Sequence, residues 1–289
     1  MPKKAHSPST DVKESLRQSG LKAKKVLGQH FLIDKTILET IVSAAELSPD
    51  DFVIEVGPGL GALTIELAKK AGHVVAIELD TGLASRLKRK LSSLSNVTIM
   101  NADIMDIDLA ELLAGKKSYK VVANIPYYIT SPILHYFVEA SPKPLLMVVM
   151  VQKEVGDAIV AKTGDMTMLA VSMQVYSKPR IISYVPAQSF YPPPKVDSVI
   201  LRFDMLAEPA VKVTDIKSFL TFVRCGFRSP RKQLRNSLAQ GLCLKPVDIS
   251  LLLTEANIEP HYRPETLTLE EWQRLYEVAI ESGKIMLPC

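Results

Sequence analysis

The segment best suited to chemistry is a tetrad that follows an apolar, strand-like run. Its members are Asn124, Ile125, Pro126 and Tyr127. An aromatic amine is a weak nucleophile because its lone pair is delocalised into the ring, so a catalyst must hold it with hydrogen-bond acceptors. The side-chain carbonyl of Asn124 and the backbone carbonyl of Ile125 can be those acceptors, since Pro126 stiffens the turn. Tyr127 can stack on the nucleobase that carries the amine. The tetrad therefore predicts chemistry at an exocyclic amine, with a plain proline turn as the alternative.

A glycine-rich loop lies upstream of this tetrad. The apolar run 52–56 breaks into three alternating glycines, Gly57, Gly59 and Gly61, and a helical pattern follows. A second apolar run then ends near Glu78. Glycine lets a backbone approach a ligand closely, and a carboxylate about 20 residues after the first glycine can accept hydrogen bonds from ribose hydroxyls. The order strand, loop, helix, strand and acid predicts a nucleoside pocket rather than a turn that only reverses the chain.

Two classes of cofactor could occupy such a pocket. Dinucleotide sites use the spacing G-x-G-x-x-G with a pyrophosphate at the helix N-terminus, whereas this loop reads G-x-G-x-G and begins two positions after Glu55. S-adenosylmethionine (AdoMet) has no phosphate and carries two cationic groups, so an acid beside the loop suits it. We expect AdoMet as cofactor and S-adenosylhomocysteine as product. No metal is expected, because Cys225, Cys243 and Cys289 lack the spacing of a zinc motif.

Other polar and aromatic residues could complete the pocket. Asp103 follows the apolar run 96–100, so it should lie on the ligand-binding edge of an open α/β sheet. There it could accept from an adenine amino group, or it could only cap a turn. His30 precedes the first strand and could fold over the cofactor mouth. A proline-rich loop carries Phe190, which could stack on a base, and Lys195, which could meet a phosphate. Such a loop can equally be an inert connector.

The apolar runs predict an α/β fold, a Rossmann-like AdoMet-dependent methyltransferase sheet with a small C-terminal all-helical domain. Strand-like runs continue at 168–176, 180–185 and 199–203, the last expected to close the sheet. Composition shifts near Pro209, and the periodicity beyond it is helical. The expected division is a basic N-terminal extension at 1–25, an AdoMet-binding catalytic domain at 26–206 and a helical domain at 207–289.

Charge is unevenly distributed along the chain. The net charge of the 289 residues is only +4, yet residues 216–247 include seven basic residues and no acid. A one-signed segment predicts a surface that faces a polyanion such as RNA, although a solvated helix face is a common alternative. The candidate RNA contacts are Lys195, Arg224, Arg228, Arg231, Lys232 and Arg235.

The sequence shows no membrane or export signal. No apolar run approaches the ~18 residues needed to span a bilayer. The amino end is basic but lacks the apolar core of a secretory signal. We therefore expect a cytoplasmic protein without membrane association, and a monomer.

Taken together, the motifs resemble those of a known family over nearly the whole chain. The similarity rests on Leu27–Leu32, Glu55–Thr64, Asn124–Tyr127, Phe190–Ser198 and Arg231–Asn236. In these segments the sequence resembles the KsgA/RsmA family of small-subunit rRNA dimethyladenosine transferases. The resemblance implies AdoMet-dependent N6,N6-dimethylation of two adjacent adenosines in the 3′-terminal hairpin loop of 16S rRNA. The implied partner is 16S rRNA within the immature 30S subunit.

The resemblance also implies roles for individual residues. The implied cofactor contacts are His30, Leu32, Gly57, Glu78, Asp103 and Asn124. The implied target-base contacts are Asn124, Tyr127 and Phe190. The chain departs from the family at one of these positions, because the family often has Asn where this chain has His30. Both side chains can donate and accept hydrogen bonds, but a histidine can also titrate.

Three other functions fit parts of the pattern. The Erm enzymes, which dimethylate large-subunit rRNA, share the fold and the tetrad, but Gly28, Gln29 and the segment 231–236 look more like the KsgA group. An RNA-binding assembly factor, for which methylation is secondary, would share the basic helical domain. DNA and protein amino-methyltransferases use a related Asn-Pro-Pro-Tyr element, in which the first proline is Ile125 here.

Overall fold

The computed structural model describes residues 29–283. The basic extension expected at 1–25 lies outside the described residues, as do Gly28 and Cys289. Within the described range, no helix combines the length and the apolar character needed to cross a membrane.

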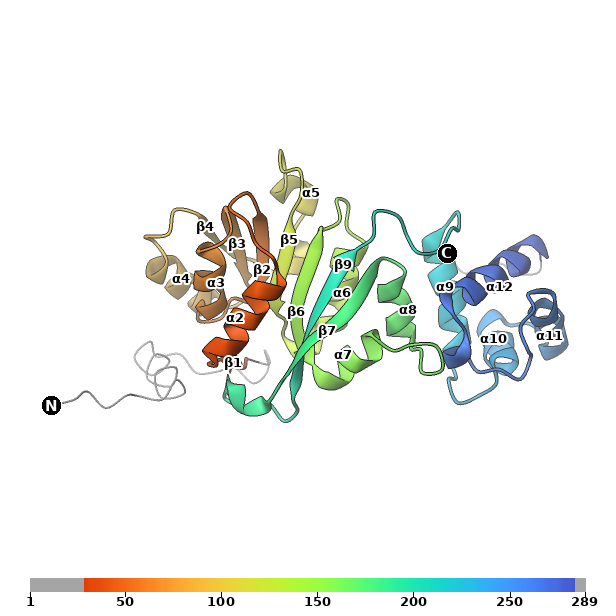
Figure 1. Cartoon of the computed structure of the whole chain (residues 1–289). Helices are drawn as coiled ribbons and strands as arrows, with labels where there is room; N and C mark the ends of the chain where they lie inside the picture. Colours follow the sequence, from red (N-terminus) through yellow and green to blue (C-terminus); the bar gives the residue numbers. More distant parts are fainter. Residues whose placement is uncertain (1–28, 284–289) are drawn as a thin grey trace. The chain divides into compact units, whose positions relative to one another are not determined.

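The chain forms two compact units, which Figure 1 shows as a sheet with covering helices and a group of helices. Among the described residues, the first unit comprises 29–156 and the segment Pro179–Met205. The second comprises Asp157–Lys178 and residues 206–283. The segment 157–178, which sequence analysis included in the catalytic domain, therefore makes its contacts mainly with the helical unit.

The first unit is built on a seven-stranded sheet of order β4-β3-β2-β5-β6-β9-β7. The strands are β2 (Phe52–Val56), β3 (His73–Glu78), β4 (Val97–Asn101), β5 (Lys120–Asn124), β6 (Leu146–Gln152), β7 (Ser177–Val185) and β9 (Ser198–Met205). Strand β2 pairs in parallel with β3 on one side and with β5 on the other. The strand order reverses between β2 and β5, so their carboxyl ends flank the crevice where open α/β sheets bind ligands.

Strand β9 pairs antiparallel with β6 inside the sheet, and β7 forms the edge. The expectation that residues 199–203 close the sheet is therefore wrong. Sequence order alone does not tell which of the last two strands lies at the edge, but β9 is mostly buried and β7 is mostly not.

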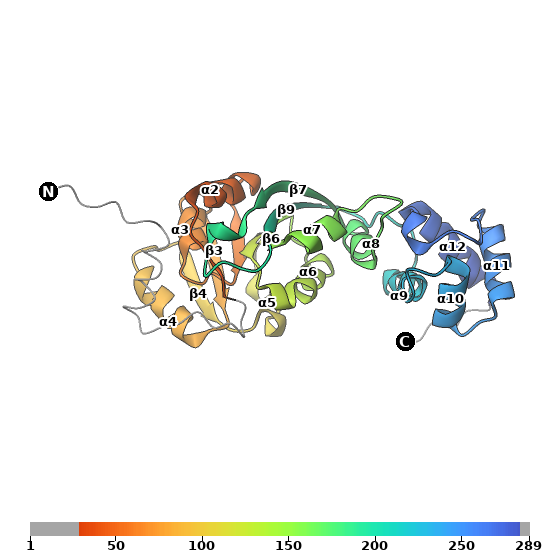
Figure 2. The ribbon, with the colours of Figure 1, turned by 90° about the horizontal axis from the view of Figure 1, so that it is seen from below.

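Helices cover both faces of the sheet, and Figure 2 shows α2 and α3 on one face and α5 and α6 on the other. The helices of this part are α2 (Lys35–Ala44), α3 (Ala62–Ala68), α4 (Thr81–Lys90), α5 (Leu109–Leu112), α6 (Thr130–Val138) and α7 (Lys153–Ile159). Asp34 and Asp80 are the N-caps of α2 and α4, because each carboxylate accepts a hydrogen bond from a first-turn backbone N–H. A small second sheet pairs β1 (Phe31–Leu32) with β8 (Phe190–Tyr191).

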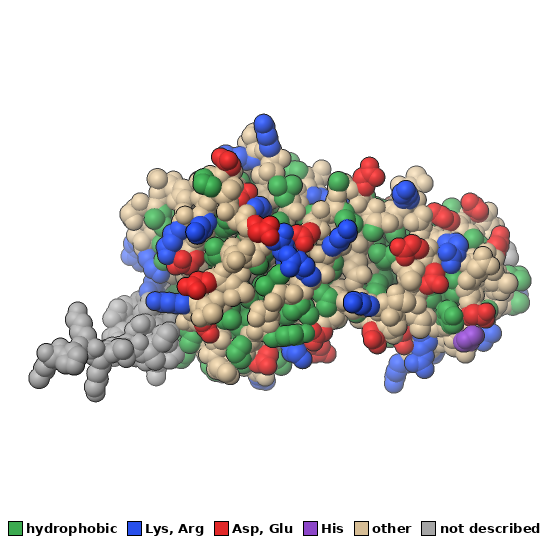
Figure 3. Space-filling model, viewed as in Figure 1, with side chains coloured by type: hydrophobic (Ala, Val, Ile, Leu, Met, Phe, Trp, Pro, Cys, Tyr) green, Lys and Arg blue, Asp and Glu red, His purple; other side chains and the backbone are tan. Residues whose placement is uncertain are grey.

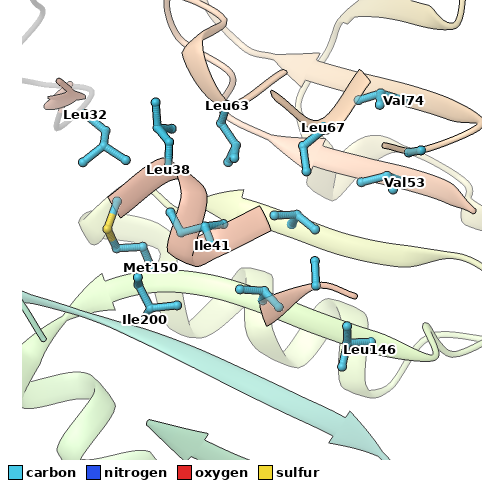
Figure 4. Close-up of a cluster of buried hydrophobic side chains, with 14 of the residues drawn as sticks. Leu32, Leu38, Ile41, Val53, Leu63, Leu67, Val74, Leu146, Met150 and Ile200 are labelled. Carbon is cyan, nitrogen blue, oxygen red and sulfur yellow. The ribbon is translucent and has the colours of Figure 1, made fainter. Parts of the chain in front are cut away.

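The core of the first unit lies between α2, α3 and the central strands, as Figure 4 shows. Ile41 from α2, Leu67 from α3 and Val148 from β6 are each 0% exposed. Burial of one such side chain stabilises the fold by about 1.5–3 kcal/mol. Phe190 belongs to the same cluster, which bears on its predicted role.

The second unit is all helical. Its helices are α8 (Met168–Gln174), α9 (Ile216–Gly226), α10 (Leu234–Leu242), α11 (Pro246–Glu255) and α12 (Leu269–Glu281). Trp272 is 0% exposed and packs against Phe222 and Phe227 at ring-centroid distances of 6.3 and 5.7 Å. The α/β class with a helical C-terminal part is thus confirmed. The strand expected at 168–176 is a helix, because Thr167 caps its first turn and a short apolar run suits either structure.

A close approach between α7 and β9 yields a test of this packing. A Cβ added at Gly156 would lie 2.1 Å from Cγ1 of the fully buried Val199. Gly156→Ala should therefore lower the free energy of unfolding by about 1–3 kcal/mol, measured by urea denaturation. In a Val199→Ala background the same change should cost almost nothing, because the clashing methyl group is gone. An equal loss of unfolding free energy in both backgrounds would contradict the close approach of Gly156 to Val199.

Candidate active site

A cavity opens at the carboxyl ends of the parallel strands. Its lining includes every residue that the resemblance implied as a cofactor contact, namely His30, Leu32, Gly57, Glu78, Asp103 and Asn124. These residues come from the segment before α2 and from the ends of β2, β3, β4 and β5. Alternating strands and helices bring such ends to one edge of a parallel sheet.

The glycine loop lies directly against the Asn124 corner. Gly57 has φ of +69°, a backbone conformation that favours glycine, and its N–H donates to the carbonyl of Ile77 at 3.0 Å. An atom at the Cβ position of Gly57 would lie 3.6 Å from both the backbone oxygen of Asn124 and Cδ of Pro126. These are ordinary van der Waals distances, so the positive φ rather than lack of space favours glycine here. The two most chemical segments of the sequence therefore lie side by side.

Glu78 is fixed by two backbone donors. Its Oε2 accepts from the N–H of Gly59 at 3.1 Å, and its Oε1 accepts from the N–H of Asp80 at 2.9 Å. Burial raises the pKa of Glu78, and these two hydrogen bonds oppose that rise. Each carboxylate oxygen has a second lone pair, so the group can still accept from ligand hydroxyls. The glycine loop and the acid predicted for the ribose are thus held as one rigid piece.

Glu55 is the most unusual acid of the site. It lines the cavity yet is 1% exposed, and its Oε2 has no hydrogen-bond partner among the described residues. Burial raises the pKa of Glu55 to about 8, against a smaller lowering by the Thr64 hydroxyl and with a further rise from Glu78. The carboxyl group is therefore protonated near neutral pH in the ligand-free protein. A cation placed beside it would favour the ionised form.

The Asn124 side chain has a defined orientation. Its Nδ2 donates to the backbone carbonyl of His30 at 3.3 Å, which leaves the amide oxygen as the other end of the group. No described residue donates to that oxygen. Below it, the N–H of Ile125 donates to the carbonyl of Met150 at 3.2 Å and anchors the tetrad to β6. The amide oxygen of Asn124 is therefore available as an acceptor.

Tyr127 completes the corner. Its hydroxyl lies 2.6 Å from Oγ of Ser198, and its ring stacks on His30 at a centroid distance of 5.8 Å. Burial raises the pKa of Tyr127. Asp103 also lines the cavity, but its Oδ1 accepts from the N–H of Met105 at 3.0 Å. Asp103 therefore combines the two roles that the sequence left open, since it caps a turn and borders the cavity.

Phe190, predicted as a target-base contact, is not among the residues that line the cavity. The side chain is 2% exposed and lies in the core with Leu32 and Leu38. Neighbouring strand residues point to opposite sides, so pairing of β8 with β1 turns Phe190 inward, whereas Tyr191 packs beside Phe31. Tyr127, rather than Phe190, is the predicted aromatic contact that borders the cavity.

Sequence analysis missed two residues of the site. Tyr128 lines the cavity and is 51% exposed, and its place directly after the tetrad was a usable signal. Lys90 on α4 donates from Nζ to the carbonyl of Leu60 at 2.7 Å and so holds the glycine loop from outside. Burial lowers the pKa of Lys90, and the charge of Arg86 adds to the effect. Nothing in the sequence pairs Lys90 with a carbonyl 30 positions away.

The basic residues expected to face RNA lie mostly on the second unit. Arg224, Arg228, Arg231 and Lys232 are exposed, and Figure 3 shows Lys and Arg side chains projecting near the lower end of α9. Arg235 differs, because it is half-buried and its Nε is enclosed without a partner among the described residues. Lys195 is exposed on the first unit.

The strand order and the cavity at the reversal between β2 and β5 define a Rossmann-like methyltransferase domain. A family model described as ribosomal RNA adenine dimethylase matches residues 20–281. Ribosomal RNA small subunit methyltransferase A from Dehalococcoides mccartyi strain 195 is 47% identical over 94% of this chain and 93% of its own. The same-named protein from Pelotomaculum thermopropionicum is 40% identical over 94% and 96%. The chain therefore belongs to the ribosomal RNA adenine dimethylase family, whose members are AdoMet-dependent methyltransferases.

Two solved structures resemble the chain over most of its length. A dimethyladenosine transferase from Plasmodium falciparum has a TM-score of 0.76 and 24% identity, and the match covers 90% of this chain and 100% of that one. The 23S rRNA methyltransferase ErmE has a TM-score of 0.68 and 30% identity, with coverage of 86% and 98%. The first likeness shows the fold. The second leaves methylation of large-subunit rRNA as an alternative function.

Glu55 should make the stability of the ligand-free protein depend on pH. The unfolded chain releases this proton near the ordinary value of 4.5 and the folded protein only near 8, so stability should fall as the pH rises between these values. Glu55→Gln should remove most of that slope in thermal melts, and Glu78 should account for a remainder. Glu66→Gln, at an exposed pair with Lys69, should leave the slope unchanged. An unchanged slope in Glu55→Gln would contradict the buried proton.

Asn124 should matter for rate more than for stability. Asn124→Ala should lower kcat for methyl transfer at saturating AdoMet by about 100-fold or more, because the acceptor that orients the amine is lost. Asn96→Ala is the matched control, since its amide holds the carbonyls of Ala68 and Ala71 at 2.8 and 3.1 Å, away from the cavity lining. The control should lower the melting temperature and leave kcat near wild type. Equal effects of both variants on kcat would count against the role of Asn124.

Proposed function

We propose that this chain converts two adjacent adenosines in the 3′-terminal hairpin loop of 16S rRNA to N6,N6-dimethyladenosine, with AdoMet as methyl donor. The observation that carries the proposal is the contact between the Gly57 loop and the Asn124 corner. A donor held by the loop would present its methyl group to an amine held at the corner. The small-subunit methyltransferases that match at 40–48% identity over nearly the whole chain support the choice of substrate.

The residues of the cavity fit AdoMet. Glu78 can accept from the ribose hydroxyls, and Asp103 can accept from the adenine amino group. The buried, unpartnered Oε2 of Glu55 suits the ammonium group, which would draw the carboxyl into its ionised form. His30 and Leu32 close the cavity from the segment before α2. When bound, AdoMet supplies an electrophilic methyl group on a sulfonium, and S-adenosylhomocysteine remains after transfer. The proposed reaction needs no metal.

The Asn124 corner would hold the amine. The amide oxygen of Asn124 and the backbone oxygen of Ile125 would accept the two N–H groups of N6, so that the nitrogen lone pair points toward the donor. Tyr127 would stack on the adenine and exclude water from one face. Pro126 keeps the turn in place. No strongly basic side chain is needed, because the amine nitrogen becomes cationic on methylation and can lose its proton to water.

The proposed partner is 16S rRNA within the immature 30S subunit. The exposed cations Arg224, Arg228, Arg231 and Lys232 would contact phosphates from the helical unit, and Lys195 would do so from the catalytic domain. Arg235 is a weaker candidate, because its guanidinium is half-buried. We keep the proposal of an AdoMet-binding catalytic domain at 26–206 and an rRNA-contacting domain at 207–289, although the segment 157–178 groups with the helical unit. We further propose that the protein acts as a monomer in the cytoplasm.

Methylation of large-subunit rRNA is the second candidate, because ErmE has a TM-score of 0.68 and 30% identity to this chain. Tritiated AdoMet incubated with unmethylated small subunits, unmethylated large subunits and duplex DNA separates the possibilities. We expect label only in the small subunit, as dimethyladenosine in the nuclease digest. Label confined to the large subunit or to DNA would reject the proposal.

Phosphate contacts on the second unit should show in the salt dependence of binding. Replacing Arg231 and Lys232 by Ala should reduce the slope of log K against log salt by about 0.7–0.9 per lost contact, measured with an rRNA hairpin. Lys69→Ala is the control, because Lys69 pairs with Glu66 on the first unit. Its slope should equal that of the wild type. An unchanged slope in the double variant would exclude these two residues from the RNA surface.

A further inference from the structure

The side chain of His30 links segments that are far apart in the sequence. Its Nδ1 lies 2.7 Å from the backbone oxygen of Pro192, 162 positions away, and its ring stacks on Tyr127 with an interplanar angle of 23°. Its own backbone oxygen accepts from Nδ2 of Asn124. His30 thus contacts the proline-rich loop, the side chain of Asn124 and the ring of Tyr127.

The hydrogen bond to Pro192 requires a proton on Nδ1 of His30. A carbonyl oxygen can only accept, so Nδ1 of His30 carries a proton and donates it. This holds for the neutral Nδ1–H tautomer and for the imidazolium alike. The ring is therefore oriented by a hydrogen bond on one edge, and its face is set against Tyr127.

Tyr127 is held at its hydroxyl end by the first residue of β9. The hydroxyl lies 2.6 Å from Oγ of Ser198, and the loop that contains Pro192 leads from β8 to Ser198. The contacts form a closed circuit that runs from His30 to Tyr127, to Ser198, along the loop to Pro192 and back to His30. Strands β1 and β8 pair through Leu32 and Phe190, and they adjoin His30 and Pro192 in the chain, so the two ends of the circuit are brought together. The Tyr127 ring therefore has one preferred orientation.

We propose that the imidazole of His30 is a positioning group for the methyl acceptor, which acts by holding the Tyr127 ring and the 192–197 loop. The inference rests on the proposed function, because Tyr127 is the predicted stacking partner of the target adenine. A stacking ring that rotates freely would let the base tilt, and transfer rates fall steeply when reacting atoms leave their aligned geometry. His30 would then affect the rate of transfer even when the cavity is saturated with AdoMet.

Three variants of the full chain separate the two contacts of the imidazole. His30→Asn keeps an amide donor near Pro192 and removes the ring, His30→Phe keeps a ring and removes the donor, and His30→Ala removes both. We expect His30→Ala to lower kcat on small subunits about tenfold, with His30→Asn and His30→Phe in between. Each kcat is measured at AdoMet concentrations well above the Kd of that variant, which calorimetry gives, so weaker cofactor binding cannot account for a lower kcat. An unchanged kcat of His30→Ala under these conditions would overturn the proposal.

A double-mutant cycle tests whether His30 acts through Tyr127. In a Tyr127→Ala background, His30→Ala should lower kcat by less than about twofold, because the ring that it positions is absent. Independent, multiplicative effects of the two substitutions would overturn the proposal. His30→Asn and His30→Phe provide the same comparison if His30→Ala fails to fold.

A readout without activity keeps this inference distinct from the proposed function. With 3-fluorotyrosine at position 127, fluorine NMR should show slow ring rotation in the otherwise unchanged protein and faster averaging in His30→Ala. The same averaging rate in both proteins would overturn the positioning role, whatever RNA is methylated. Failure of the proposed function would instead appear as absent label in small subunits while the NMR difference remains.

Discussion

The site depends on the close approach of two backbones at the reversal point of the sheet. Strands β2 and β5 are parallel neighbours, so the loops that follow them must pass each other at one edge. Gly57 permits this passage, because its position lies within van der Waals reach of the Asn124 carbonyl and the Pro126 ring and has a left-handed backbone conformation. The cofactor loop and the amine-binding corner are thus aligned by the sheet itself, before any ligand binds.

Buried acids prepare this edge for a cationic ligand. Glu78 is held by backbone N–H groups, whereas Glu55 has an unpartnered oxygen and a pKa raised to about 8. A buried acid without a partner is costly in the ligand-free protein. A cofactor that brings positive charge would compensate that cost, so part of the selectivity for a cationic donor follows from the fold. The same acids would disfavour a pyrophosphate.

Much of the site could be predicted because its residues follow regular elements. Gly57, Glu78, Asp103 and Asn124 each stand at the end of a strand, and the alternation of strands and helices brings such ends together. The place of Phe190 could not be predicted, since it depends on pairing between β8 and β1, which are remote in the sequence. Local signals also misassigned residues 168–176, where a short apolar run fits a strand or a buried helix. The circuit through His30 is likewise a product of tertiary contacts alone.

A crystal structure with bound S-adenosylhomocysteine tests the central claim most directly. The account predicts that the ribose lies on Glu78, the amino group lies near Glu55, and the sulfur faces the side-chain oxygen of Asn124. A sulfur atom turned away from Asn124, or a ligand bound outside the Gly57 loop, would contradict the account.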